Sequence, residues 1–219
     1  MIDIERQQKL FVSLSKFIKK KINVYAVGGT AMMFYGFKDN TLDIDLVFEN
    51  EKERKLFKEA LTSMGYEKMD SNKVYNKKDN QPEMFTLGDE RFDLFIDKVV
   101  LFMFSEEMKK RARQRTYQFG ENFILNIASP EDIIIMKCAT DRAKDREDAI
   151  KIIEKFNIDW NLLIFSAEEQ VKLGKDIAVM ELGCFLEELV VKMKVKIPKQ
   201  VLDKLFAIFN KQRKNRKLA

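Results

Sequence analysis

The chain has 219 residues, of which 46% are hydrophobic and 34% are charged, a balance typical of a soluble globular protein. No apolar run reaches the roughly 18 residues that a membrane-spanning helix needs, and the first residues lack the pattern of a secretory signal, so we expect a cytoplasmic protein without a membrane partner. The absence of histidine excludes Ser-His and Cys-His catalytic pairs, and two cysteines without a CxxC spacing do not indicate a zinc site. Catalysis would therefore have to use carboxylates, lysines, backbone amides or metal ions.

The first part of the chain alternates between helical and strand patterns. Apolar spacing and capping residues predict helices over 3–20, over 30–36 and from an Asn50 cap to Gly65. Strands are expected at 23–27, 42–48, 66–69, 73–76, 83–87 and 91–97.

The pattern changes after residue 127. A helix from about Ser105 and strands over 116–119 and 123–127 complete the first part, and everything beyond Ser129 and Pro130 is helical. The sequence therefore predicts a mixed α and β domain over 1–127 and a helical C-terminal domain over 128–219.

Two acidic residues interrupt the apolar strand predicted at 42–48. Asp43 and Asp45 are two positions apart, so both carboxylates project from one face, while Leu42, Ile44 and Leu46 take the other. A divalent cation such as Mg²⁺ would relieve the repulsion between them. Asp93 is a third strand carboxylate that a neighbouring strand can bring to the same place. Asp97 shares its face but lies about 13 Å further along the strand, so Asp93 is preferred.

Two glycines precede this carboxylate pair. Gly28 and Gly29 come directly before the predicted helix 30–36, where backbone amides can hold a phosphate, and Thr30 adds a hydroxyl. A phosphate-binding turn beside metal-binding carboxylates suits phosphoryl or nucleotidyl transfer assisted by two metal ions.

The order of these residues resembles the polymerase β-like nucleotidyltransferase superfamily, whose motifs Gly28, Gly29, Asp43, Asp45 and Asp93 match. The resemblance implies an α+β fold with a nucleotidyltransferase-type mixed sheet flanked by helices. It also implies an enzyme that transfers a nucleoside monophosphate from an NTP, such as ATP, to an acceptor hydroxyl and releases pyrophosphate. The three aspartates would hold two Mg²⁺ ions, or Mn²⁺ in their place, and Asp93 would help to deprotonate the acceptor.

The segment after residue 129 is similar to the one that follows the core in the abortive-infection type nucleotidyltransferases, the toxins of toxin–antitoxin pairs, and their uncharacterised relatives. The matching residues are Lys137, Arg142, Lys144, Asp145 and Asp148. The resemblance implies that Lys137 contacts the triphosphate and that Asp145 or Asp148 orients Lys137 or the substrate. On one continuous helix, the residues that share a face are Lys137, Asp141, Lys144, Asp145 and Asp148, and the alternative is an ordinary solvated face of Lys–Asp pairs. Many relatives have an arginine just before the Asp pair, where this chain has Lys38.

Other readings of the sequence stay open. The basic segments 109–115 and 211–217 are candidate contacts for RNA or an acidic protein partner, or else ordinary solvated surfaces. The acceptor is open between RNA, protein and small molecules. The chain is alternatively an inactive nucleotide- or partner-binding module of the same fold. There is no GxxxxGK[ST] or GxGxxG motif, which argues against a Walker ATPase or a Rossmann dehydrogenase.

Overall fold

The computed structural model describes residues 1–75, 80–139 and 142–218. The chain forms two compact units. The first comprises Met1–Val100 with Glu106–Ser129, and the second comprises Leu101–Ser105 with Pro130–Ala219.

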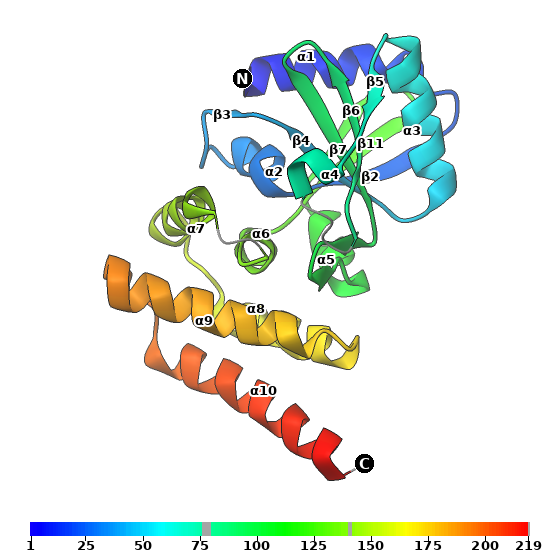
Figure 1. Ribbon diagram of the computed structural model, residues 1–219. Coiled ribbons are helices and arrows are strands. Elements are labelled where there is room, and N and C mark those ends of the chain that lie inside the picture. The colour runs from blue at the N-terminus through cyan, green and yellow to red at the C-terminus, as the bar shows by residue number, and fades with distance from the viewer. Residues whose placement is uncertain (76–79, 140–141, 219) are drawn as a thin grey trace. The chain divides into compact units, whose positions relative to one another are not determined.

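The first unit combines a mixed sheet with helices (Figure 1). Its helices are α1 (Ile4–Ser15), α2 (Gly28–Phe34), α3 (Glu51–Ser63), α4 (Asn72–Tyr75) and α5 (Glu106–Ala112). Its strands are β1 (Ile2–Asp3), β2 (Ile22–Ala26), β3 (Asn40–Thr41), β4 (Ile44–Phe48), β5 (Glu67–Met69), β6 (Glu83–Leu87), β7 (Glu90–Ile96), β8 (Lys98–Val99), β10 (Thr116–Phe119) and β11 (Phe123–Ile127). Among the described residues, seven strands form one sheet in the order β10-β11-β2-β4-β7-β6-β5. The β11–β2 and β4–β7 pairs are parallel and the others antiparallel, which confirms the expected mixed sheet.

An aromatic core covers one face of this sheet. Phe57 of α3 packs against Phe48 of β4, Phe92 of β7 and Phe123 of β11, with ring centroids 5.3, 5.9 and 5.6 Å away. Phe11 of α1 packs against the same Phe123 at 5.4 Å, so α1 and α3 share this face. Truncating one such buried ring to alanine typically costs about 3–5 kcal/mol. Because side chains alternate along a strand, the residues next to Phe48 in β4 and next to Phe92 in β7 point to the opposite face of the sheet.

The second unit is helical. Its elements are the short strand β9 (Phe102–Met103) and the helices α6 (Pro130–Lys137), α7 (Ala143–Lys155), α8 (Trp160–Lys172), α9 (Asp176–Met193) and α10 (Lys199–Leu218). The Gln170 side chain accepts a hydrogen bond from the backbone N–H of Met103 at 2.9 Å and donates one to its carbonyl at 2.8 Å, which ties residues 101–105 to α8. Among the described residues, no helix has both the length and the apolar composition needed to cross a membrane.

Three sequence-based element predictions are wrong in part. The first helix ends at Ser15 rather than residue 20, because the backbone amides of Lys16 and Phe17 bond three residues back and form a turn, after which Ile18 is buried. The strand expected at 73–76 is instead the short helix α4 as far as residue 75, and residue 76 lies outside the described residues. The strand expected from residue 42 begins at Ile44, and Leu42 is 56% exposed rather than packed with Ile44.

The continuous helix expected through residues 137–148 is also wrong. It is two helices, because α6 ends at Lys137 and α7 begins at Ala143. Asp141, which was expected on the same helical face, lies outside the described residues.

Candidate active site

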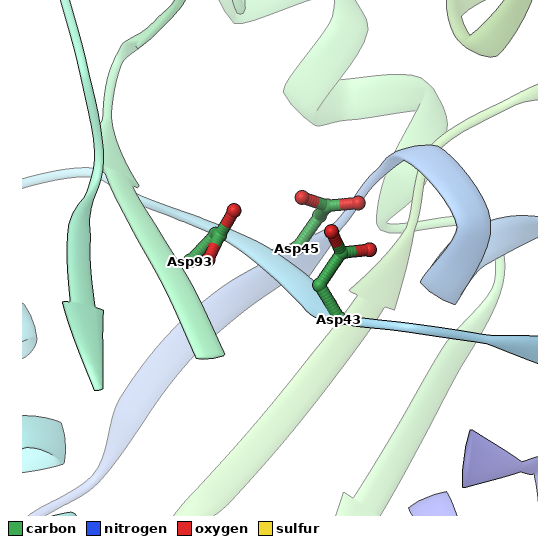
Figure 2. A group of neighbouring side chains, drawn as sticks. All are labelled: Asp43, Asp45 and Asp93. Atoms are coloured by element: carbon green, nitrogen blue, oxygen red, sulfur yellow. The ribbon is translucent and has the colours of Figure 1, made fainter. Parts of the chain in front are cut away.

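Three carboxylates meet on the sheet face opposite the aromatic core. β4 and β7 are parallel, and their register places Asp45 directly beside Asp93. Asp43 lies one residue before β4 and projects to the same side (Figure 2). One carboxylate oxygen from each residue lies within 4.8 Å of the other two. Asp93 is fully buried and the other two are half-buried, so the group is partly withdrawn from solvent.

Arg91 neutralises part of this negative charge. Its Nε donates to Asp93 Oδ1 at 2.9 Å, and its Nη2 donates to Asp93 Oδ2 at 3.3 Å and also to Asp43 Oδ2. Arg91 was not among the residues singled out from the sequence. Its position two residues before Asp93 is the signal that identifies it, because it places both side chains on one face of β7.

The two glycines lie at the start of α2 and leave room for the carboxylates. Gly28 and Gly29 are the first two residues of the helix, rather than preceding it as the sequence suggested. Gly28 has φ +54°, and a Cβ there would lie 2.5 Å from Asp45 Oδ2. A Cβ at Gly29 would lie 2.5 Å from Thr41 Oγ1 and 3.5 Å from Lys38 Nζ. The glycines therefore allow the helix start to approach Asp45 closely, with the Lys38 ammonium beside Gly29.

Thr30 supports Asp45 through the backbone. The Thr30 side chain is fully buried, and its hydroxyl accepts a hydrogen bond from the backbone N–H of Asp45 at 2.8 Å. On the other side, the Thr41 hydroxyl donates to Asp43 Oδ1 at 3.3 Å. Two hydroxyls thus hold the segment that carries the carboxylate pair.

A second charged cluster lies in the helical unit. Lys137 Nζ donates to Asp145 Oδ1 at 2.9 Å and to Asp148 Oδ2 at 2.6 Å, across the break between α6 and α7. Lys137 is only 8% exposed and the two aspartates 2% each, so an ordinary solvated face is the wrong description of these residues. Arg142 Nε also donates to Asp145, at 2.9 Å, whereas Lys144 is exposed.

The charge balance of this cluster favours an ionised lysine. Burial acts to lower the pKa of the Lys137 ammonium, but attraction and hydrogen bonding from Asp145 and Asp148 outweigh it, and the pKa is raised. Lys137 is therefore protonated at neutral pH. The cluster and the three carboxylates of the sheet belong to different compact units.

Several basic residues of segment 109–115 form ion pairs or hydrogen bonds with other residues of the first unit. Lys109 is buried and pairs with Asp97 at 2.8 Å and Glu106 at 2.9 Å. Arg113 pairs with Glu49, and Arg115 donates to the Phe34 carbonyl at 2.6 Å. In segment 211–217 the side chains from residue 212 onward lie outside those that the structure describes.

Comparisons with known proteins bear on the fold and the family. Two solved structures of the antibiotic-resistance factor ANT(2'')-Ia resemble this chain. The solution structure matches with a TM-score of 0.46 and 15% identity, over 70% of this chain and 85% of that chain. The crystal structure in complex with adenylyl-2''-tobramycin matches with a TM-score of 0.45 and 14% identity, over 83% of this chain and 98% of that one. No curated protein matches the sequence.

The family comparison covers most of both units. A family model described as "Nucleotidyltransferase of unknown function (DUF6036)" matches residues 7–193, which include all three carboxylates and the Lys137 cluster. The chain therefore belongs to this nucleotidyltransferase family.

Proposed function

We propose that this protein is a metal-dependent nucleotidyltransferase that transfers a nucleoside monophosphate from an NTP to an acceptor hydroxyl and releases pyrophosphate. Membership of a nucleotidyltransferase family supports the reaction class. The observation that carries the proposal is the convergence of Asp43, Asp45 and Asp93, whose oxygens lie within 4.8 Å of one another. Three ionised carboxylates at this spacing repel one another, and a cation bound between them would offset this repulsion.

The donor set fits Mg²⁺. All three ligands are carboxylate oxygens, which hard divalent cations prefer, and Mn²⁺ accepts the same set. Two oxygens bound to one Mg²⁺ lie at most about 4.2 Å apart, since each bond is about 2.1 Å long, so small side-chain rotations suffice from a spread of 4.8 Å. Bound at this site, two such ions would neutralise the phosphates and lower the pKa of the acceptor hydroxyl.

Each residue of the chain then has a proposed task. Asp43 and Asp45 hold the ions, and Asp93 serves as a ligand and accepts the proton of the acceptor hydroxyl. The backbone amides of Gly28 and Gly29 hold the terminal phosphates of the NTP. Thr30, which was expected to contact phosphate itself, keeps Asp45 in position through its hydrogen bond to the Asp45 backbone.

For the helical unit we propose that Lys137 binds phosphate. Asp145 and Asp148 fix its ammonium group at 2.9 and 2.6 Å, so the side chain is already ordered. An ordered lysine loses less conformational entropy when it binds an anion. In this proposal residues 1–127 bind the metal ions, and residues 128–219 supply Lys137 to bind phosphate.

The finer part of the proposal concerns the donor and the biological role. ATP is the proposed donor, the acceptor is a hydroxyl of RNA, protein or a small molecule, and the role is that of a toxin in a toxin–antitoxin pair. A toxin role requires that expression of the wild-type protein arrests growth and that the Asp43→Asn/Asp45→Asn variant does not. Growth arrest by both proteins would refute a toxicity that depends on transfer.

A binding module without catalysis is the second candidate. The contacts of Arg91 with Asp43 and Asp93 favour it, because a protein that never binds metal would need such a permanent counter-charge. Nucleotide binding without pyrophosphate release in any acceptor mixture would support this candidate over the enzyme.

Calorimetry with the four NTPs tests the main proposal. Binding is expected to require Mg²⁺ and to be lost in Asp43→Asn/Asp45→Asn. A matched control is Asp70→Asn/Asp89→Asn, which removes two exposed carboxylates of the same unit and should bind like wild type. Failure of the wild-type protein to bind any NTP would refute the proposal.

A further inference from the structure

The guanidinium of Arg91 contacts two of the three candidate metal ligands, Asp43 and Asp93. A single nitrogen, Nη2, contacts Oδ2 of Asp43 and lies 3.3 Å from Oδ2 of Asp93. The neighbouring Nε lies 2.9 Å from Oδ1 of the same Asp93. The guanidinium therefore engages both oxygens of Asp93 and links that residue to Asp43.

This arrangement follows from the strand register. Asp45 and Asp93 are paired across β4 and β7, and two residues before Asp93 the same face of β7 carries Arg91. Continuing the parallel register by two residues brings Arg91 level with Asp43. The strand register thus places Arg91 beside the carboxylates, on the same face of the sheet.

A guanidinium nitrogen and a metal ion cannot share this position. An ion held by Asp43 and Asp93 would need carboxylate oxygens that Nη2 now contacts, since Mg²⁺ binds its oxygen ligands directly at about 2.1 Å. Two cations that close would also repel. Either the ion stays out or the guanidinium moves.

The Arg91 side chain has room to move. The Arg91 side chain is 21% exposed, whereas the Asp93 side chain is fully buried, so the guanidinium has access to solvent that Asp93 lacks. Its long aliphatic stem has several rotatable bonds, which allow the charged end to move while Cα stays in the strand.

We propose that Arg91 is a displaceable internal counter-ion of the carboxylate group. Without a divalent cation the guanidinium holds Asp43 and Asp93 together and limits their repulsion, and cation binding drives it out toward solvent. Arg91 is therefore a positioning residue that weakens metal binding and stabilises the metal-free protein. The inference rests on the proposed metal-dependent function and adds a competition to it.

Titration with Mn²⁺ in the absence of nucleotide tests the competition. Arg91→Met keeps much of the aliphatic stem and removes the charge, so its dissociation constant for Mn²⁺ should fall about tenfold, equivalent to about 1.4 kcal/mol. The matched control is Arg54→Met. Arg54 is similarly buried, at 16% side-chain exposure, and pairs with Glu51 and Glu83 rather than with the three aspartates. The control should bind Mn²⁺ like wild type.

The midpoint of thermal unfolding tests the same proposal through protein stability as well as through Mn²⁺ affinity. In EDTA, Arg91→Met should unfold at a lower temperature than wild type, and saturating Mn²⁺ should reduce the difference. Arg91→Lys provides a second variant if Arg91→Met does not fold. Lysine keeps the charge but cannot bridge two carboxylates with a planar fork, so its Mn²⁺ affinity should lie between those of wild type and a charge-free variant.

The possible failures are distinguishable. Equal or weaker Mn²⁺ binding by the Arg91 variants, with wild-type binding intact, would overturn the displacement and leave the proposed function standing. Absence of Mn²⁺ binding in wild type and in every Arg91 variant would overturn both.

Discussion

Asp45 on β4 and Asp93 on β7 lie directly opposite one another in a parallel strand pair, on the sheet face away from the aromatic core. Like charges in such a pair are destabilising, and here a third carboxylate, Asp43, lies beside them. Arg91 offsets part of this repulsion, and a bound divalent cation would offset more of it.

Asp45→Asn should abolish the stabilisation by Mg²⁺ without lowering the stability of the metal-free protein. The amide keeps the shape of the side chain but removes one of three neighbouring negative charges. In EDTA the thermal midpoint should therefore stay unchanged or rise, while the stabilisation by Mg²⁺ disappears. Metal-dependent transfer should fall at least about a hundredfold, since metal ions supply several kcal/mol of transition-state stabilisation. Stabilisation by Mg²⁺ that persists in the variant would contradict the assignment of Asp45 to metal binding.

Gly28→Ala should disturb the site more than an ordinary glycine substitution. Residue 28 has φ +54°, and its Cβ would lie 2.5 Å from Asp45 Oδ2. Gly36→Ala is the control, because Gly36 has φ +70° and its Cβ would meet nothing within 4 Å. Both variants should lose about 1–2 kcal/mol from the left-handed backbone.

Only Gly28→Ala should lose more than this and also weaken Mg²⁺ binding, because Asp45 must move. Urea denaturation and Mg²⁺ titration measure the two effects. Equal losses in both variants would show that the close contact between Gly28 and Asp45 is unimportant.

Lys137→Met should destabilise the helical unit. The substitution leaves Asp145 and Asp148 buried without the ammonium that contacts both, and breaking a buried ion pair in this way costs about 3–5 kcal/mol. Lys144→Met removes an exposed lysine from α7 and should change the free energy of unfolding little. The comparison uses urea unfolding of the full chain. Similar losses in both variants would argue against a structural role for the buried cluster.

Glu83 should make stability depend on pH in acid. Partial burial acts to raise its pKa, but hydrogen bonds from Lys68 and Lys58 and the charge of Arg54 outweigh it and lower the pKa from 4.5 to about 2. A carboxyl whose pKa is lower in the folded state stabilises the fold above its unfolded pKa, and this contribution is lost as the pH falls toward the folded value. The relevant window therefore runs from 4.5 down to about 2.

Unfolding of wild type and Glu83→Gln at several pH values checks this prediction. The stability difference should be largest above about pH 5 and shrink toward about pH 2. Glu59→Gln, at an exposed position of α3, is the control and should track wild type across the range. A Glu83→Gln difference that stays constant with pH would contradict the prediction.

Local pattern was enough to identify most elements and the carboxylates. The side-chain alternation of strands predicted that Asp43 and Asp45 would share a face, and their oxygens do converge. The capping side chain of Asn50 accepts a hydrogen bond from the Glu53 amide at the expected start of α3. The preference for Asp93 over Asp97 follows from distance along a strand, and Asp97 instead pairs with Lys109.

The helix break between α6 and α7 was not predictable from periodicity. Lys137, Asp145 and Asp148 fit one helical face, and a single helix would have left them in solvent. The structure instead brings Asp145 and Asp148 to Lys137 from a second helix and buries all three. Residue spacing alone does not report whether one helix or two helices carry these residues.

The sequence by itself identified the three carboxylates and the nucleotidyltransferase family, because the residue types and their spacing along single strands limit the chemistry that the site could perform. It also determined the two-part organisation into mixed and helical regions. Only the tertiary structure decided that β4 pairs with β7 in the register that sets Asp45 against Asp93 and brings Arg91 to Asp43. Strand pairing depends on contacts between residues about 48 positions apart in the chain, and no local propensity encodes which strands become neighbours.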